Sequence, residues 1–198
     1  MDATPRVEPL DKSFWRRHVR EAMRGFPAES RAEASQKLCA QLLAQPVWSN
    51  SKRVLCFAPL RDEPDIYPVI DNALEFKSMV TVPRFDPERN CFVAALLTCR
   101  AALDPGPFGT LEPEAACPVV PLNQLDLILV PGVAFDFTGR RLGRGKGFYD
   151  RLLAEVCGHK CGVAFDMQLV AELPEEPHDV RVDSILTPSR WQRCGVAG

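Results

Sequence analysis

Close to its N-terminus the chain repeats hydrophobic residues every three to four positions, which is the period of a helix with one buried face. The first such run predicts a helix over 13–24 and consists of Phe14, Trp15, Val19 and Met23. A second helix is expected to begin near Pro27 and to end at Pro46, because proline fits the first turn of a helix and breaks a helix further along. A third run predicts another helix and consists of Ile66, Val69, Ile70, Ala73 and Leu74.

Short apolar runs separate the helical segments and predict buried strands. These runs cover residues 54–58, 80–82, 91–98, 125–130, 162–165 and 183–187. A further helical pattern occupies 149–156, whereas 100–123 is rich in proline and glycine, is expected to be irregular, and is long enough for a functional role. Strands that alternate with helices indicate an α/β fold in three layers, with a mostly parallel or mixed central sheet flanked by helices.

Length and composition fit one globular domain over residues 1–198, with a loose N-terminal segment at 1–11. The hydrophobic fraction of 46% and the charged fraction of 25% are ordinary for such a domain. The formal net charge of −2 argues against a general binder of nucleic acid or of anionic membranes. No apolar stretch reaches the roughly 18 residues that a membrane span needs.

The cysteine pattern bears on the compartment. The sequence contains 8 cysteines, none of them in a C-x-x-C pair, and several lie inside apolar runs. This pattern favours free, buried thiols in a reducing compartment over a disulfide framework. The N-terminus carries Asp2 and Glu8 and lacks the apolar segment of a signal peptide. We therefore expect a cytoplasmic protein.

The most informative segment spans 130–153, where glycines alternate with basic residues in the order Gly143, Arg144, Gly145, Lys146, Gly147. Glycine lets the backbone approach a ligand closely and adopt positive φ. Free N–H groups ahead of a helix, together with two full positive charges, are suited to bind phosphate. A mobile basic surface loop is the alternative interpretation, and glycines at this spacing do not exclude it.

The glycine segment matches neither common nucleotide-binding motif. Arg140 stands where a P-loop would need its first glycine, and Phe148 follows Gly147, which breaks the Rossmann pattern G-x-G-x-x-G. The segment nevertheless lies between the predicted strand at 125–130 and the predicted helix at 149–156. Open α/β sheets bind their ligands at such strand-to-helix loops, and this context favours the phosphate-binding interpretation.

Several separated motifs complete the pattern. They are Lys12 with Arg16, the strand at 52–58 with Glu63 after it, the element GPFGTLEP at 106–113, the segment from Pro131 to Asp150, and a C-terminal group that includes 162–166, Gln168, Pro174, 178–180 and Asp183. In this order they resemble the 5-formyltetrahydrofolate cyclo-ligase family, also called 5,10-methenyltetrahydrofolate synthetase, over roughly residues 12–188. Phe148 departs from the family's usual tyrosine; it keeps the ring and loses a hydroxyl.

The resemblance implies the family's three-layer α/β fold and its reaction. That reaction is the ATP-dependent conversion of 5-formyltetrahydrofolate to 5,10-methenyltetrahydrofolate, through phosphorylation of the formyl oxygen and ring closure, with release of ADP and phosphate. It further implies that ATP contacts Lys12, Arg16, Arg141, Leu142, Gly143, Arg144, Gly145, Lys146, Gly147, Phe148 and Tyr149. The implied folate contacts are Ala58, Glu63, Arg144, Gly145, Lys146, Gly147 and Phe148.

The resemblance also implies catalytic and metal-binding roles. Arg144 and Lys146 would be the catalytic residues, because they would neutralise the charge that builds up during phosphoryl transfer. Asp150 and Asp179 would bind Mg²⁺, which prefers carboxylate oxygens and takes only one or two of them from protein.

Plainer alternatives exist for most of these residues. Lys12 and Arg16 lie one helical turn apart and would share a solvated face. Asp150 would be an acid favoured by a helix N-terminus, Asp179 a turn residue, and Glu63 a surface-loop acid.

Other residues are open or discounted. Phe148 and Tyr149 would either stack on the pterin or pack the helix against the sheet, and Asp136 is either part of the functional signature or a structural turn residue. We interpret His178 as a loop residue, because none of the three histidines is at ligand spacing from another.

Two rival functions follow from the same residues. One is a catalytically inactive folate- or nucleotide-binding homologue, and the other is a different enzyme on a similar α/β scaffold, such as a sugar-phosphate isomerase or a CoA transferase. The expected partner is 5-formyltetrahydrofolate, with or without a polyglutamate tail. We expect no nucleic-acid or membrane partner, and a monomer.

Overall fold

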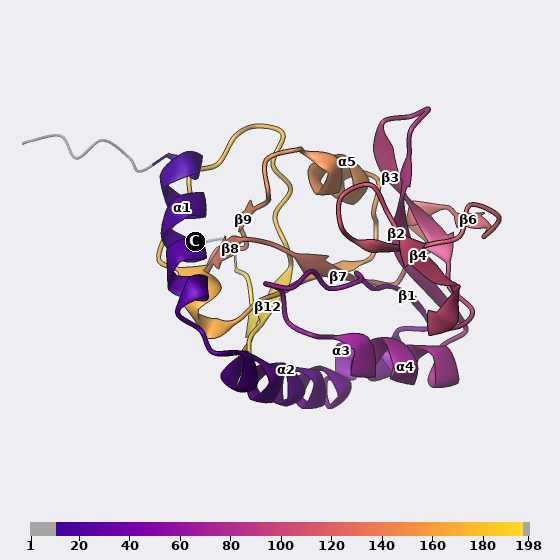
Figure 1. Ribbon diagram of the computed structural model, residues 1–198, viewed down its shortest axis with the longest axis horizontal. Helices are drawn as coiled ribbons and strands as arrows, with labels where there is room; N and C mark the ends of the chain where they lie inside the picture. Colours follow the sequence, from indigo (N-terminus) through magenta and orange to yellow (C-terminus); the bar gives the residue numbers. More distant parts are fainter. Residues whose placement is uncertain (1–10, 196–198) are drawn as a thin grey trace, which may run out of the picture.

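The computed structural model describes residues 11–195, and its main feature is an eight-stranded mixed sheet (Figure 1). From one edge to the other, the strands are β13 (Trp191–Arg193), β12 (Ser184–Leu186), β10 (His159–Val163), β7 (Leu127–Pro131), β1 (Arg53–Leu55), β2 (Met79–Asp86), β3 (Cys91–Leu96) and β6 (Val119–Val120). The central strands from β12 to β2 are parallel, and β13, β3 and β6 are antiparallel to their neighbours. The predicted mixed sheet is therefore confirmed.

Helices cover both faces of this sheet (Figure 1). One face carries α2 (Ala28–Leu43), α3 (Pro46–Asn50) and α4 (Tyr67–Phe76), and the other carries α5 (Phe148–Ala154). Successive residues of β1 show why: Val54 packs in the first of these layers and Leu55 in the second. A strand buried on both faces must be apolar at every position, which explains the continuous apolar runs and confirms the three layers.

A smaller unit packs at one end of the sheet under α1 (Lys12–Arg24) (Figure 1). It contains a three-stranded sheet of β11 (Leu169–Val170), β8 (Ala134–Asp136) and β9 (Arg141–Leu142). Asp11 caps α1, because its Oδ1 accepts a hydrogen bond of 2.7 Å from the Phe14 amide. The rest of the predicted loose segment, 1–10, lies outside the described residues.

The helices predicted from periodicity are confirmed, and two local predictions were incomplete. Pro46 ends the second helix as expected but also occupies the first turn of α3, where its missing N–H costs nothing. The segment 100–123 is not wholly irregular. It contains β4 (Leu103–Pro105) and β5 (Leu111–Pro113), paired as a hairpin, and short 3-10 turns at Arg100–Ala102 and Leu122–Gln124. A third 3-10 turn lies at Asp166–Gln168.

The topology reverses direction between β1 and β7. From β1 the chain passes through α4 to β2 on one side, and from β7 it passes through α5 to β10 on the other side. Neighbouring strands whose connections leave in opposite directions open a crevice at their carboxyl ends. The fold therefore positions a ligand site where β1 and β7 end.

Candidate functional site

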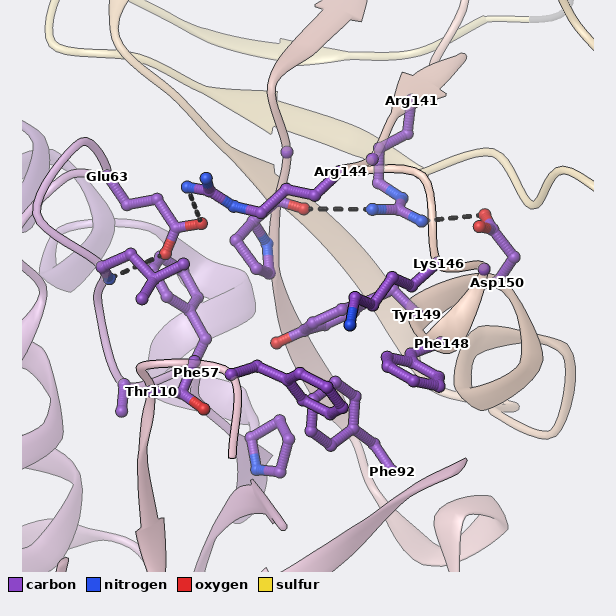
Figure 2. Close-up of a pocket in the computed structure, with 18 of the residues that line it drawn as sticks. Phe57, Glu63, Phe92, Thr110, Arg141, Arg144, Lys146, Phe148, Tyr149 and Asp150 are labelled. Atoms are coloured by element: carbon purple, nitrogen blue, oxygen red, sulfur yellow. Dashed lines mark hydrogen bonds and ion pairs between the residues drawn. The ribbon is translucent and has the colours of Figure 1, made fainter. Parts of the chain in front are cut away.

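A cavity of about 460 Å³ lies at the carboxyl ends of β1 and β7. Phe57 and Ala58 follow β1, and Pro131 and Gly132 lie at the end of β7. The remaining walls come from the glycine loop with the start of α5, from β2 and β3, and from the tip of the β4–β5 hairpin (Figure 2). The predicted residues that line this cavity are Ala58, Glu63, Arg141, Gly143, Arg144, Lys146, Gly147, Phe148, Tyr149 and Asp150.

The glycine loop adopts a backbone that other residues would disfavour. Gly145 has φ 101° and Gly147 has φ 65°, both in the left-handed region. Gly143 is favoured for a different reason, since a Cβ there would lie a tight 3.0 Å from Arg141 Nη1. The sequence pattern therefore corresponds to backbone requirements, and these bring the side chains of Arg144 and Lys146 to the cavity.

Arg141 is a buried cation in the cavity wall. Its side chain is only 3% exposed, and its Nη2 donates to Asp150 Oδ1 at 2.8 Å. Its Nη1 donates to the Pro131 carbonyl at 3.3 Å, while its Nε has no hydrogen-bond partner within residues 11–195. A buried donor without a partner is costly, so this Nε–H is available to a ligand oxygen.

Arg144 lies against two acids, Asp62 and Glu63, of which Figure 2 shows Glu63. Its Nη2 is 2.6 Å from Asp62 Oδ1 and 3.1 Å from Glu63 Oε1. The other Glu63 oxygen accepts a hydrogen bond of 2.9 Å from the Leu60 amide. The Glu63 side chain is 7% exposed, and this burial raises its pKa, opposed by the Leu60 amide and by Arg144. Glu63 is therefore not the surface acid that its loop position suggested.

Lys146 lies over an aromatic surface. Its Nζ is 4.1 Å from the centroid of the Phe108 ring and 5.9 Å from that of Phe148, and no carboxylate within residues 11–195 pairs with it. Phe108 and Phe148 belong to a cluster with Phe85 and Phe92, with ring centroids about 5 to 6 Å apart. Phe148 therefore packs α5 against the strands and lines the cavity at the same time.

Tyr149 completes the aromatic wall. Its ring lies 6.0 Å from Phe92 and beneath the Arg141 guanidinium at 5.5 Å. Burial raises the pKa of its phenol, with the Glu63 charge adding to the shift. The hydroxyl is therefore a neutral hydrogen-bonding group that faces the cavity (Figure 2).

The other predicted nucleotide contacts lie around the cavity rather than in its lining. Arg16 donates from Nε to the Gly143 carbonyl at 2.9 Å, and its guanidinium lies close to Gly145. Leu142 is buried in the hydrophobic cluster under α1. Arg16 thus attaches α1 to the glycine loop. The alternative interpretation, in which Lys12 and Arg16 only form a solvated helix face, does not describe this contact.

The two acids predicted to bind metal are in different surroundings. Asp150 lines the cavity and has one oxygen paired with Arg141. Both oxygens of Asp179 are engaged, since Lys12 Nζ lies 2.9 and 2.6 Å from them and the Glu176 amide donates to Oδ2 at 2.7 Å. Within the described part of the chain, the carboxylates and imidazole close enough to share an ion are those of Glu176, His178 and Asp179, a group that excludes Asp150.

Asp136 has a structural environment. Its carboxylate is fully buried and accepts hydrogen bonds from the backbone N–H groups of Thr138, Arg140 and Leu173 at 2.9 to 3.1 Å. These contacts fix the turn between β8 and β9, which leads into the glycine loop. The turn interpretation of this signature residue is the one that the geometry favours.

Sequence reasoning missed the aromatic and hairpin residues of the cavity. Phe57, Phe92, Phe108 and Thr110 all line it. The available signal was the element at 106–113, whose Glu112 is buried and accepts hydrogen bonds from the Phe85 amide at 2.8 Å and from Thr110 Oγ1 at 3.1 Å. Glu112 thereby fastens the hairpin to β2 and holds Phe108 at the cavity.

Comparison with known proteins agrees with this geometry. Residues 10–188 match the 5-formyltetrahydrofolate cyclo-ligase family. The chain belongs to this family. All the residues that line the cavity fall within the matched range, so the family match spans the whole candidate site.

Relatives and solved structures support the assignment over nearly full length. The chain is 32% identical over 193 residues to the 5-formyltetrahydrofolate cyclo-ligase of Mycolicibacterium smegmatis, covering 93% of this chain and 97% of that one. It is 31% identical to the Escherichia coli K12 enzyme of the same name, over 88% and 99%. The NMR structure of Aquifex aeolicus 5,10-methenyltetrahydrofolate synthetase matches with a TM-score of 0.84 at 35% identity, covering 94% of each chain.

Among residues 11–195, no helix combines the length and the apolar character that a bilayer crossing requires.

Proposed function

We propose that this cavity performs the reaction of the cyclo-ligase family, the ATP-dependent conversion of 5-formyltetrahydrofolate to 5,10-methenyltetrahydrofolate. The observation that carries the proposal is a single cavity with a cationic glycine loop on one wall and the buried carboxylate of Glu63 on the other (Figure 2). The first wall suits a triphosphate, and the second suits the amino and ring N–H groups of a pterin.

The chemistry has to overcome a poor electrophile and a poor leaving group. Transfer of the γ-phosphoryl group from ATP to the formyl oxygen breaks the β–γ phosphoanhydride bond and releases ADP. The neighbouring folate nitrogen then donates its electron pair to the activated formyl carbon, closes the ring and loses its proton, and inorganic phosphate departs with the oxygen. Such a transfer requires positioning and charge stabilisation rather than a covalent enzyme intermediate.

The cations of the loop have separate tasks in this scheme. Lys146 supplies an uncompensated positive charge to the transferring phosphoryl group, and Arg144, which is paired with two acids, supplies a further cation at the Glu63 side of the cavity. The unpartnered Nε–H of Arg141 is a buried donor suited to a phosphate oxygen. Lys12 and Arg16, through the contact of Arg16 with Gly143, extend the positive surface toward α1 and the rest of the nucleotide.

Asp150, in the first turn of α5, is the better placed of the two proposed magnesium ligands. Asp150 lines the cavity and has a carboxylate oxygen with no hydrogen-bond partner in residues 11–195, so it offers a hard oxygen ligand beside the proposed phosphates. Bound Mg²⁺ would neutralise phosphate charge there. Asp179 is the second proposed ligand and requires Lys12 to release it first.

A magnesium titration separates the two acids. We expect Asp150→Ala and Asp179→Ala to raise the Mg²⁺ concentration needed for half-maximal activity. Both variants should also unfold at a lower temperature, because each change leaves a poorly exposed cation, Arg141 or Lys12, without its carboxylate, so the titration is run below that temperature. Asp150→Ala should have the larger effect, because its side chain faces the cavity. Wild-type behaviour of either variant across the titration would remove that residue from the proposed metal site.

The proposed folate contacts lie on the side of the cavity that carries Glu63. Glu63 accepts from the pterin N–H groups, and Ala58, which also lines the cavity, has no side chain large enough to block the ring. We further propose that the chain acts as a single domain, as a monomer and in the cytoplasm, and that it accepts substrates with or without a polyglutamate tail.

The direct test mixes the protein with 5-formyltetrahydrofolate and Mg-ATP and follows the absorbance of 5,10-methenyltetrahydrofolate. We expect product only when ATP is present, with ADP and phosphate formed in proportion to it. Product without ATP would favour a different enzyme on this scaffold, and AMP with pyrophosphate would replace phosphoryl transfer by adenylation. Ligand binding without turnover would instead identify an inactive homologue.

A further inference from the structure

One acid beside the cavity, Asp62, has no role in the proposed chemistry. Asp62 lies in the turn after β1, and its Oδ1 accepts from Arg144 Nη2 at 2.6 Å across 82 residues of sequence. Within residues 11–195, Arg144 is the only side chain that pairs with the Asp62 carboxylate. This contact joins the β1–α4 turn to the glycine loop.

Asp62 and Glu63 are not equivalent partners of Arg144. Glu63 lines the cavity, is 7% exposed, and uses its second oxygen to accept from the Leu60 amide. Asp62 is 45% exposed and lies outside the cavity, at a small adjoining hollow that it shares with Arg144 and with Val19 and Arg20 of α1. Only Glu63 is therefore placed to contact a substrate.

The orientation of Arg144 leaves part of its guanidinium unused. Both acids bond to Nη2, and within the described residues no protein group accepts from its Nε or Nη1. The backbone around it gives little restraint, because Gly143 and Gly145 flank it. A guanidinium that is held through one nitrogen has a fixed orientation, and its remaining N–H donors stay free to bind a ligand.

We propose that Asp62 is a positioning residue, which holds Arg144 at the cavity mouth when Glu63 turns its carboxylate to the substrate. The inference rests on the proposed function, in which Glu63 binds the folate ring and Arg144 the transferring phosphoryl group. When the substrate takes the Glu63 oxygen, the contact with Asp62 remains and keeps Arg144 from moving into solvent.

The test is a double-mutant cycle between Asp62 and Arg144. Because Asp62 acts on the transition state through Arg144, Asp62→Asn should lower kcat about fivefold and leave KM for 5-formyltetrahydrofolate within about twofold. In an Arg144→Ala background the same change should lower kcat by less than about 1.5-fold. Asp62→Glu, which keeps the charge, should restore most of the activity.

A matched control uses another ion pair of the same kind. Asp71 pairs with Arg100 at 2.8 Å, is similarly exposed and lies outside the cavity lining. Asp71→Asn should leave kcat unchanged. Equal losses from Asp62→Asn in both backgrounds, an unchanged kcat, or no recovery in Asp62→Glu would each overturn the inference.

A second measurement does not depend on turnover. The ¹⁵N relaxation of the Arg144 Nε–H group is measured with 5-formyltetrahydrofolate bound and ATP omitted, and the signal is assigned by its loss in Arg144→Lys. It should show a restrained side chain in the wild-type protein and in Asp62→Glu, and a mobile one in Asp62→Asn. Equal mobility in all three would contradict the positioning role. Failure of the proposed function would appear separately, as absence of ATP-dependent product from the wild-type protein.

Discussion

Arg144 and Lys146 are two residues apart in one loop, yet they meet opposite surroundings at the cavity. Arg144 ends between the carboxylates of Asp62 and Glu63. Lys146 ends over the ring of Phe108, at 4.1 Å from its centroid, with no acid near enough to pair with it in residues 11–195. The two acids compensate the charge of Arg144, whereas the aromatic ring holds Lys146 without neutralising it.

The difference shows how a protein can keep charge available. A carboxylate fixes a cation strongly but cancels most of the field that a distant phosphate would feel. An aromatic face attracts the ammonium through its quadrupole and leaves the net charge intact. We therefore expect Lys146 to contribute more to phosphoryl transfer than Arg144, and Arg144 to contribute more to the stability of the site.

The largest predicted effect is that of Lys146→Ala. Loss of an uncompensated charge should lower kcat/KM at least about 100-fold, or roughly 2.7 kcal/mol of barrier. Thermal stability should change by no more than about 0.5 kcal/mol, since the residue is an exposed loop lysine. Steady-state kinetics and calorimetry measure the two quantities, and Lys146→Arg should retain part of the activity.

Lys37 provides the control for this prediction, because it is an exposed lysine on α2, outside the cavity lining. Lys37→Ala should have wild-type kinetics. Wild-type kinetics in Lys146→Ala, or a loss of activity that only follows unfolding, would return the loop to a flexible basic surface segment.

Arg144→Ala should lower kcat/KM less, by about tenfold, and should affect stability in a pH-dependent way. Removing Arg144 takes away a group that opposes the raised pKa of Glu63, so that pKa should rise further. A carboxyl whose pKa is raised by folding binds more protons in the folded state, so stability falls as pH rises from about 4.5 through the raised value.

The measurement is thermal unfolding of Arg144→Ala and the wild-type protein between pH 5 and pH 8. The difference should be about 1 kcal/mol at pH 8 and smaller at pH 5, allowing for the partial exposure of Arg144. A stability difference between the two proteins that does not depend on pH would show that Arg144 does not affect the pKa of Glu63.

Phe108→Leu tests the aromatic wall with a smaller effect. Loss of the ring beneath Lys146 should lower kcat/KM about threefold, since an exposed cation–π contact is worth about 0.5–1 kcal/mol. Phe85→Leu is the matched variant, because the Phe85 ring packs 4.9 Å from that of Phe108 in the same cluster, whereas the rings beneath Lys146 among residues 11–195 are those of Phe108 and Phe148. Equal rate losses in both variants would indicate packing rather than an effect on Lys146.

Phe148→Tyr, which restores the hydroxyl of the family's usual residue, should have the smallest effect. The ring keeps its place against Phe85, Phe92 and Phe108, so kcat/KM should stay within about twofold and the unfolding free energy within about 0.5 kcal/mol. A large gain in activity would mean that a hydroxyl at this position contacts substrate.

The local sequence pattern was sufficient to predict most helices and strands and the position of the glycine loop. Helical periodicity located α1, α2 and α4, and apolar runs located the buried central strands, because burial on one face or on both is recorded along the chain itself. The shortest strands, including β8, β9 and β11, were not expected. Two or three residues carry no period, and their pairing depends on partners distant in sequence.

The sequence alone determined which backbone positions require glycine and which cations the loop carries, since φ preferences and charge belong to single residues. Only the tertiary structure decided which groups surround Arg144 and Lys146. The turn at 62–63 and the hairpin tip at 107–111 are both brought to the glycine loop by the topology of the sheet, the turn to Arg144 and the tip to Lys146. Contacts between residues about 40 to 80 positions apart depend on strand order and packing, which no local pattern records.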